Sequence, residues 1–89
     1  PKARVPRQPR ALILAPTREL AAQVGASFEA YGTHMEHRVE VVFGGVSLFH
    51  QRKALQAGVD ILVATPGRLL DLASSQDVNL RHIEVFVLD

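Results

Sequence analysis

Short apolar runs alternate with longer segments of mixed polarity along this chain of 89 residues. The apolar runs are Ala11–Ala15, Val39–Phe43, Ile61–Ala64 and Ile83–Leu88. Three of them are rich in Val, Ile and Leu with little alternation, which is typical of strands covered on both faces. Glu40 interrupts the second run and indicates a strand at the edge of a sheet, or a strand end.

The segments between these runs have the apolar spacing of helices. One helical face, from about Thr17 to His34, is marked by apolar residues at steps of four and three: Leu20, Val24, Phe28 and Tyr31. Shorter helices are predicted over 48–55, where Gly58 can end the helix, and over 69–73. The resulting order is β-α-β-α-β-α-β. Crossovers of this length allow right-handed connections, so we predict an α/β fold with a parallel sheet.

Residues suited to phosphate binding directly follow three of the predicted strands. They are Pro16–Leu20 (PTREL), Gly44–Gly45 and Thr65–Arg68 (TPGR). In parallel α/β sheets the carboxyl ends of the strands share one edge, and ligands bind there. Helix N-termini with an adjacent arginine attract anions, and glycine lets a backbone approach closely. Three such junctions on one edge favour a run of phosphates, as in a nucleic-acid backbone, without base readout.

Two of these junctions also have the residues of helix caps. Thr65 followed by Pro66 predicts an N-cap and the first helical position. Thr17 followed by Arg18 predicts a similar arrangement one strand away. We therefore expect both threonines to cap their helices.

Charge is distributed unevenly along the chain. Residues 1–10 contain three prolines and four of the ten basic residues, and we interpret them as a basic loop or tail before a domain over 11–89. From residue 11 onward six basic residues face nine acidic ones, so bulk charge does not indicate a nucleic-acid partner. Any nucleic-acid affinity of the domain must come from a few locally placed groups.

Composition excludes some classes of protein. The sequence has no Cys, which excludes disulfides and thiolate metal sites and fits a cytoplasmic protein. It also has no apolar run of 18 residues, so we expect no contact with a membrane.

The motifs at the strand ends resemble a known family. The string APTRELAAQ (Ala15–Gln23), the GG pair, the TPGR box and a strand ending in VLD occur in this order in DEAD-box RNA helicases. The resemblance covers residues 11–89. It implies a partial RecA-like domain, of the P-loop NTPase type, from the first domain of a helicase. The whole protein would unwind or remodel RNA with ATP.

The resemblance also implies a role for each motif residue. Single-stranded RNA would be held through its backbone by Pro16, Thr17, Arg18, Gly44, Gly45, Thr65, Pro66, Gly67 and Arg68. Glu19, from its position in the first turn of its helix, is interpreted as an acid that stabilises the helix dipole or as a partner of a nearby arginine, and so as a residue that supports the motif. Asp89 matches the first acid of the DEAD box, a catalytic residue that in the family handles the Mg²⁺ of bound ATP.

The phosphate-binding loop G-x-x-x-x-G-K-S/T is missing from this sequence, because neither Lys2 nor Lys53 follows a glycine. ATP and Mg²⁺ are therefore expected in the whole protein only, and this chain alone is expected to be inactive. The expected partners are single-stranded or structured RNA and the remainder of the helicase, with its P-loop segment and second RecA-like domain. Two alternatives stay open, namely a non-catalytic RNA- or partner-binding module and an inert structural segment.

Two other groups of side chains have simpler interpretations. His34, Glu36 and His37 fall where the first helix is expected to end, and cations are favoured there without a metal. We therefore predict no metal site. The aromatic residues are interpreted as core packing and not as a base-stacking platform; they are Phe28, Tyr31, Phe43, Phe49 and Phe86.

Overall fold

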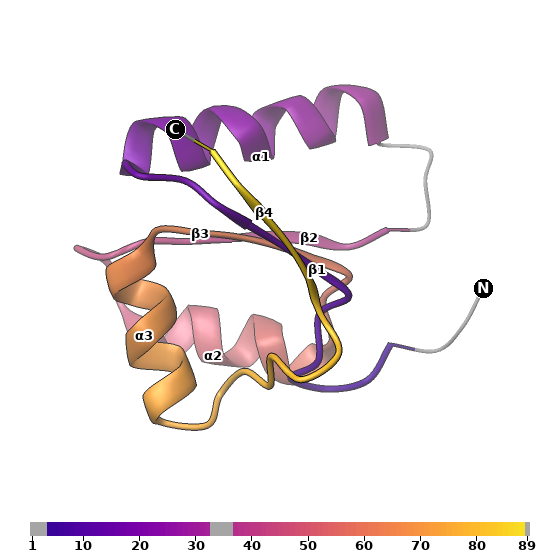
Figure 1. Ribbon diagram of the computed structural model, residues 1–89, viewed down its shortest axis with the longest axis vertical. Coiled ribbons are helices and arrows are strands. Elements are labelled where there is room, and N and C mark those ends of the chain that lie inside the picture. Colours follow the sequence, from indigo (N-terminus) through magenta and orange to yellow (C-terminus); the bar gives the residue numbers. More distant parts are fainter. Residues whose placement is uncertain (1–3, 33–36, 89) are drawn as a thin grey trace.

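The computed structural model describes residues 4–32 and 37–88, which form one sheet with helices on both faces (Figure 1). The elements in chain order are β1 (Ala11–Leu14), α1 (Arg18–Gly32), β2 (Val39–Val42), α2 (Leu48–Ala57), β3 (Ile61–Ala64), α3 (Pro66–Ser74) and β4 (Glu84–Val87). The strands are parallel and lie side by side in the order β2-β3-β1-β4. The predicted order of elements and the parallel α/β class are confirmed.

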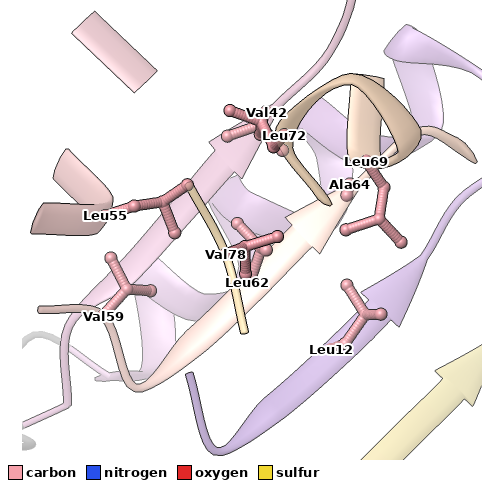
Figure 2. Packing of buried hydrophobic residues seen from close by; sticks show 9 residues of the cluster. All are labelled: Leu12, Val42, Leu55, Val59, Leu62, Ala64, Leu69, Leu72 and Val78. Carbon is pink, nitrogen blue, oxygen red and sulfur yellow. The ribbon is translucent and has the colours of Figure 1, made fainter. Parts of the chain in front are cut away.

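Side chains of the inner strands alternate between two apolar layers, because successive residues of a strand point to opposite faces. One layer lies between the sheet and the pair α2 and α3 (Figure 2); it consists of Leu12, Val42, Leu55, Val59, Leu62, Ala64, Leu69, Leu72 and Val78. The other layer lies beneath α1, where Ala15, Ala21 and Val63 are buried. Both faces of β1 and β3 are therefore covered, which explains why their sequences are apolar throughout.

The two edge strands differ in their cover. β2 lies at one edge, as Glu40 indicated, and packs against both α1 and α2. β4 lies at the other edge, and all of its residues are exposed, with Val85, Phe86 and Val87 between 51% and 67%. The expectation that this last run is covered on both faces is therefore wrong. Within the described chain β4 pairs with β1 alone, and α1 packs over β2 and β3 instead.

Residues 4–10 form no helix or strand but are held at the amino ends of the strands. The buried Asp60, just before β3, accepts a hydrogen bond from Arg4 Nε at 2.8 Å and one from the Arg38 backbone N–H at 2.7 Å. Pro9 in this segment is buried. The basic segment therefore packs at the amino ends of the strands, opposite to the carboxyl ends that carry the motifs.

The histidine cluster considered from the sequence falls largely outside the described residues, since only His37 is described, and it is exposed. Among residues 4–32 and 37–88, no three His, Asp or Glu side chains are grouped as metal ligands would be. None of the helices in that part of the chain combines the length and apolar character needed to cross a bilayer.

Candidate nucleic-acid interface

The carboxyl ends of β1, β2 and β3 lie together at one end of the sheet, toward the left of Figure 1. We call this end the rim and define it by residues 15–18, 43–47 and 65–68. Its junctions are joined by hydrogen bonds that continue the sheet: Ala15 N–H donates to Ala64 O at 2.9 Å, and Thr65 N–H donates to Val42 O at 3.1 Å. The three motif segments predicted to share an edge therefore do so.

The first junction combines a capped helix with an exposed cation. Thr17 Oγ1 accepts a hydrogen bond from the Leu20 backbone N–H at 3.1 Å, so the predicted cap is confirmed. Pro16, Arg18 and Glu19 are exposed, and Glu19 lies in the first turn of α1, where a carboxylate is favoured by the helix dipole. The Arg18 guanidinium lies 5.0 Å from the centre of the Phe43 ring, a cation–π distance. Arg18 thereby reaches from α1 to the end of β2.

The second junction is the turn at Gly44 and Gly45. Gly45 has a φ of +85°, a left-handed conformation that glycine adopts without steric cost. A Cβ atom at Gly45 would lie 2.9 Å from Arg18 Nη1, whereas a Cβ atom at Gly44 would meet nothing within 4 Å. The left-handed backbone therefore favours glycine at position 45, while position 44 presents open backbone.

The third junction begins α3 without a side-chain cap. Pro66 occupies the start of the helix as predicted, and Thr65 has the extended backbone of an N-cap, with φ −82° and ψ 148°. The Thr65 side chain makes no capping hydrogen bond, so that part of the prediction is wrong. The N–H groups of the first turn consequently have no side-chain acceptor, which is the condition for an anion site at a helix N-terminus. A Cβ atom at Gly67 would also meet nothing within 4 Å.

Arg68 lies beside this helix start with its side chain only 10% exposed. Its Nη1 donates to Val46 O at 3.1 Å and to Gln51 Oε1 at 3.0 Å. Its Nε is 3.6 Å from Asp71 Oδ2, which is too long for a hydrogen bond, and is buried without a hydrogen-bond partner. Arg18 and Arg68 therefore both lie next to the glycine turn, one exposed and one mostly buried.

Gln51 was not singled out by the sequence analysis. It is 5% exposed, and its Nε2 donates to Phe43 O at 3.2 Å. The signal was present in the sequence, because Gln51 falls between Leu48 and Leu55 at the three- and four-residue steps of the inward face of α2. A polar residue on a buried helical face requires hydrogen-bond partners.

Two aromatic residues do not lie in the core, contrary to the interpretation from the sequence. Phe49 is 60% exposed in the first turn of α2, with Lys53 Nζ 5.4 Å from its ring centre. Phe86 is exposed because nothing in the described chain covers β4. Phe28 and Phe43 do pack against the core beneath α1, as expected. The side chain of Tyr31 is outside the described part.

The described residues do not by themselves fit ATP and Mg²⁺. Asp89 lies outside the described residues. The sequence lacks the glycine-rich loop and its lysine, whose N–H groups and ammonium cradle phosphates. Within residues 4–32 and 37–88, no metal-ligating side chains are grouped. The rim itself presents arginine side chains, helix N–H groups and open glycine backbone.

The chain is similar to curated RNA helicases. It is 48% identical over 87 residues to the ATP-dependent RNA helicase RhlB of Xanthomonas axonopodis pv. citri, which covers 97% of this chain and 15% of the relative. It is 46% identical over 82 residues to the DEAD-box ATP-dependent RNA helicase 52A of Oryza sativa subsp. japonica, covering 92% of this chain and 14% of the relative. The chain thus spans about a seventh of the length of these relatives.

Comparison of structures agrees with this result. The yeast DEAD-box splicing factor Prp28 superimposes with a TM-score of 0.78 at 36% identity, covering 89% of this chain and 19% of that one. The sequence model of the DEAD/DEAH box helicase family matches residues 3–89. Motif order, fold and this nearly complete match agree, and the chain belongs to the DEAD/DEAH box helicase family.

Proposed function

We propose that the rim holds the sugar–phosphate backbone of single-stranded RNA, as part of a protein that unwinds or remodels RNA with ATP. One observation carries the proposal: Arg18, the Gly44–Gly45 turn and the uncapped start of α3 are adjacent on one edge of the sheet. This edge combines positive charge, free N–H donors and open backbone. A run of phosphates needs these features, and a single apolar ligand does not.

Each junction contributes in a different way. Arg18 supplies an exposed charge for a phosphate. The N–H groups at Gly67 and Arg68 supply donors at the positive end of α3, and Thr65 adds a hydroxyl that is not used for capping. Gly44 leaves space for close approach of the RNA backbone. These contacts recognise the backbone and leave the sequence of bases unread.

Strand separation follows from such contacts if they hold one strand in a bent path. A continuous duplex cannot follow that path, so the second strand would be released. The relatives RhlB and 52A are described as ATP-dependent RNA helicases, which supports assigning ATP and Mg²⁺ to the whole protein. The exposed apolar β4 is the surface that we expect the remainder of the helicase to cover.

The experiment is fluorescence anisotropy of a labelled single-stranded oligouridylate titrated with the chain at several salt concentrations. Arg18→Ala is compared with Arg81→Ala. The second substitution removes an exposed arginine that precedes β4 and so lies near the amino ends of the strands, away from the rim. Circular dichroism confirms that each protein is folded. We expect Arg18→Ala to lower affinity and to reduce the log–log salt slope by about 0.7, the value for one phosphate contact on a single strand. Arg81→Ala should leave both quantities unchanged.

The other outcomes separate the alternatives. Equal effects of the two substitutions would mean that RNA binds outside the rim, for example on the basic segment 4–10. No binding by the folded wild-type chain would favour an inert structural segment. Binding of a protein partner without RNA binding would favour the partner-binding alternative.

A further inference from the structure

We propose that Gln51 is a positioning residue that, together with Arg68, sets the conformation of the Gly44–Gly45 turn for RNA. This inference rests on the proposed function of the rim. Gln51 belongs to no motif of the sequence analysis, and it does not reach the surface, since only 5% of it is exposed. It would therefore act on RNA through the turn and not by contact.

The carbonyl groups on both sides of the two glycines are held by one linked pair of side chains. On the amino side of the turn, Phe43 O accepts from Gln51 Nε2 at 3.2 Å. On the carboxyl side, Val46 O accepts from Arg68 Nη1 at 3.1 Å. The pair is closed by the hydrogen bond from Arg68 Nη1 to Gln51 Oε1 at 3.0 Å. The turn is therefore fixed at both ends by residues of α2 and α3.

The chemistry of these groups dictates the orientation of the glutamine amide. A guanidinium only donates hydrogen bonds and a backbone carbonyl only accepts them. The amide oxygen of Gln51 must therefore face Arg68, and its nitrogen must face Phe43. A leucine at this position would match the neighbouring Leu48 and Leu55, but it would leave the part-buried Phe43 carbonyl and the mostly buried Arg68 guanidinium without this partner.

The turn needs such support because its glycines impose little conformational preference of their own. Gly45 is held at a φ of +85°, and Gly44 has no neighbour that a Cβ atom would touch. Glycine loses more conformational freedom on ordering than any other residue. A turn that is already ordered binds RNA without losing that freedom at the binding step, which raises affinity.

The first test measures the turn in the free chain by amide hydrogen exchange. Gln51→Met keeps the size of the side chain and an apolar packing surface while removing both hydrogen-bonding groups. Gln56→Met makes the same change at an exposed position of the same helix. We expect Gln51→Met to accelerate exchange at residues 44–47 about five- to tenfold, the effect of losing one or two net hydrogen bonds, while exchange in β3 stays near wild type. Gln56→Met should change neither region.

The second test measures RNA affinity with the same variants. We expect Gln51→Met to weaken oligouridylate binding about five- to tenfold with an unchanged salt slope, because no phosphate contact is lost. Gln56→Met should bind as wild type does. A double variant with Arg68→Gln should lose less affinity than the two single effects combined, since both substitutions break the same linked pair.

Three results would overturn the proposal. Unchanged exchange at residues 44–47 in Gln51→Met would show that the pair does not order the turn. Acceleration throughout the chain, including β3, would assign Gln51 to general stability instead. Local acceleration with wild-type RNA affinity would show that the order of the turn does not matter for binding. If the wild-type chain does not bind RNA, the proposed function fails, while the exchange experiment still decides whether Gln51 orders the turn.

Discussion

At the scale of single residues, the two adjacent glycines of the rim have different physical tasks. Gly45 is favoured in the free protein because its φ is +85°, a left-handed conformation that is strained for other residues. Gly44 has open space where its Cβ atom would be. The two glycines belong to one motif, but only Gly45 has a backbone conformation that favours glycine in the free protein.

Alanine substitutions should separate these tasks. We expect Gly45→Ala to lower the free energy of unfolding by about 1–2 kcal/mol, the cost of a left-handed conformation for an L-residue. Gly44→Ala should leave stability near wild type but weaken RNA binding, because its methyl group would stand where the RNA backbone approaches. Urea unfolding and anisotropy titrations measure the two effects. Equal behaviour of the variants in both assays would contradict the distinction.

Asp60 provides a second residue-scale prediction, concerning pH. Burial raises the pKa of Asp60, but the Arg38 backbone N–H and the Arg4 guanidinium together lower it by more, so the pKa lies below its ordinary value. An acid whose pKa is lower in the folded state stabilises the fold above its unfolded pKa, about 3.9, and this contribution is lost as the pH falls through the folded value.

We therefore expect Asp60→Asn to reduce the free energy of unfolding at pH 7 and to narrow the difference between pH 7 and pH 3. Urea unfolding of both proteins at the two pH values measures this. Glu29→Gln serves as the control, because that carboxyl group is exposed on α1. If Asp60→Asn lost as much stability between pH 7 and pH 3 as the wild type does, Asp60 would not be the source of this pH dependence.

At the scale of elements, the packing of α1 on the sheet depends on Gly25. This glycine is buried in the middle of the helix, and a Cβ atom there would overlap Val41 Cγ2 of β2. Helix propensity favours alanine over glycine by about 1 kcal/mol. Close packing opposes the substitution, since overpacking costs typically about 1–3 kcal/mol. We conclude that the glycine is kept for the approach of helix to strand.

The expected result of Gly25→Ala is therefore a loss of stability, despite the gain in helix propensity. Val41→Ala makes room for the new methyl group. The double variant should therefore lose less free energy of unfolding than the two single variants lose together. Chemical unfolding of the four proteins of this cycle measures the coupling. A stabilised Gly25→Ala protein, or strictly additive effects, would show that α1 can shift at no cost.

At the scale of the whole molecule, the sheet is covered unevenly. β1 and β3 lie between two apolar layers, while β4 exposes apolar side chains at its edge. Exposed apolar edge strands invite pairing with another strand. This edge is where we expect the remainder of the helicase to pack.

Because the phosphate-binding loop is missing from this sequence, we expect the chain alone not to hydrolyse ATP, with or without RNA. Phosphate release is measured against a buffer blank, with a full-length DEAD-box relative as the positive control. RNA-stimulated turnover by the purified chain, above the blank and proportional to its concentration, would contradict this expectation.

The sequence by itself determined the order of elements, the parallel sheet and the positions of the three junctions. Apolar periodicity reports which faces are buried, and the long crossovers leave parallel pairing as the simple solution. The bounds of β3, predicted as Ile61–Ala64, agree with the structure. The order of the motifs was enough to indicate the family, because each motif follows a strand and so falls on one edge.

Only the tertiary structure decided what each residue contacts there and how far it is buried. Several features depend on neighbours far away in the sequence. They are the missing side-chain cap at Thr65, the exposure of Phe49 and Phe86, and the hydrogen bond between Gln51 and Arg68. Periodicity predicts that a face is buried but not which element covers it, so the exposure of β4 could not be predicted. A hydrogen-bond partner is set by distance and direction between elements, and a local sequence pattern contains neither.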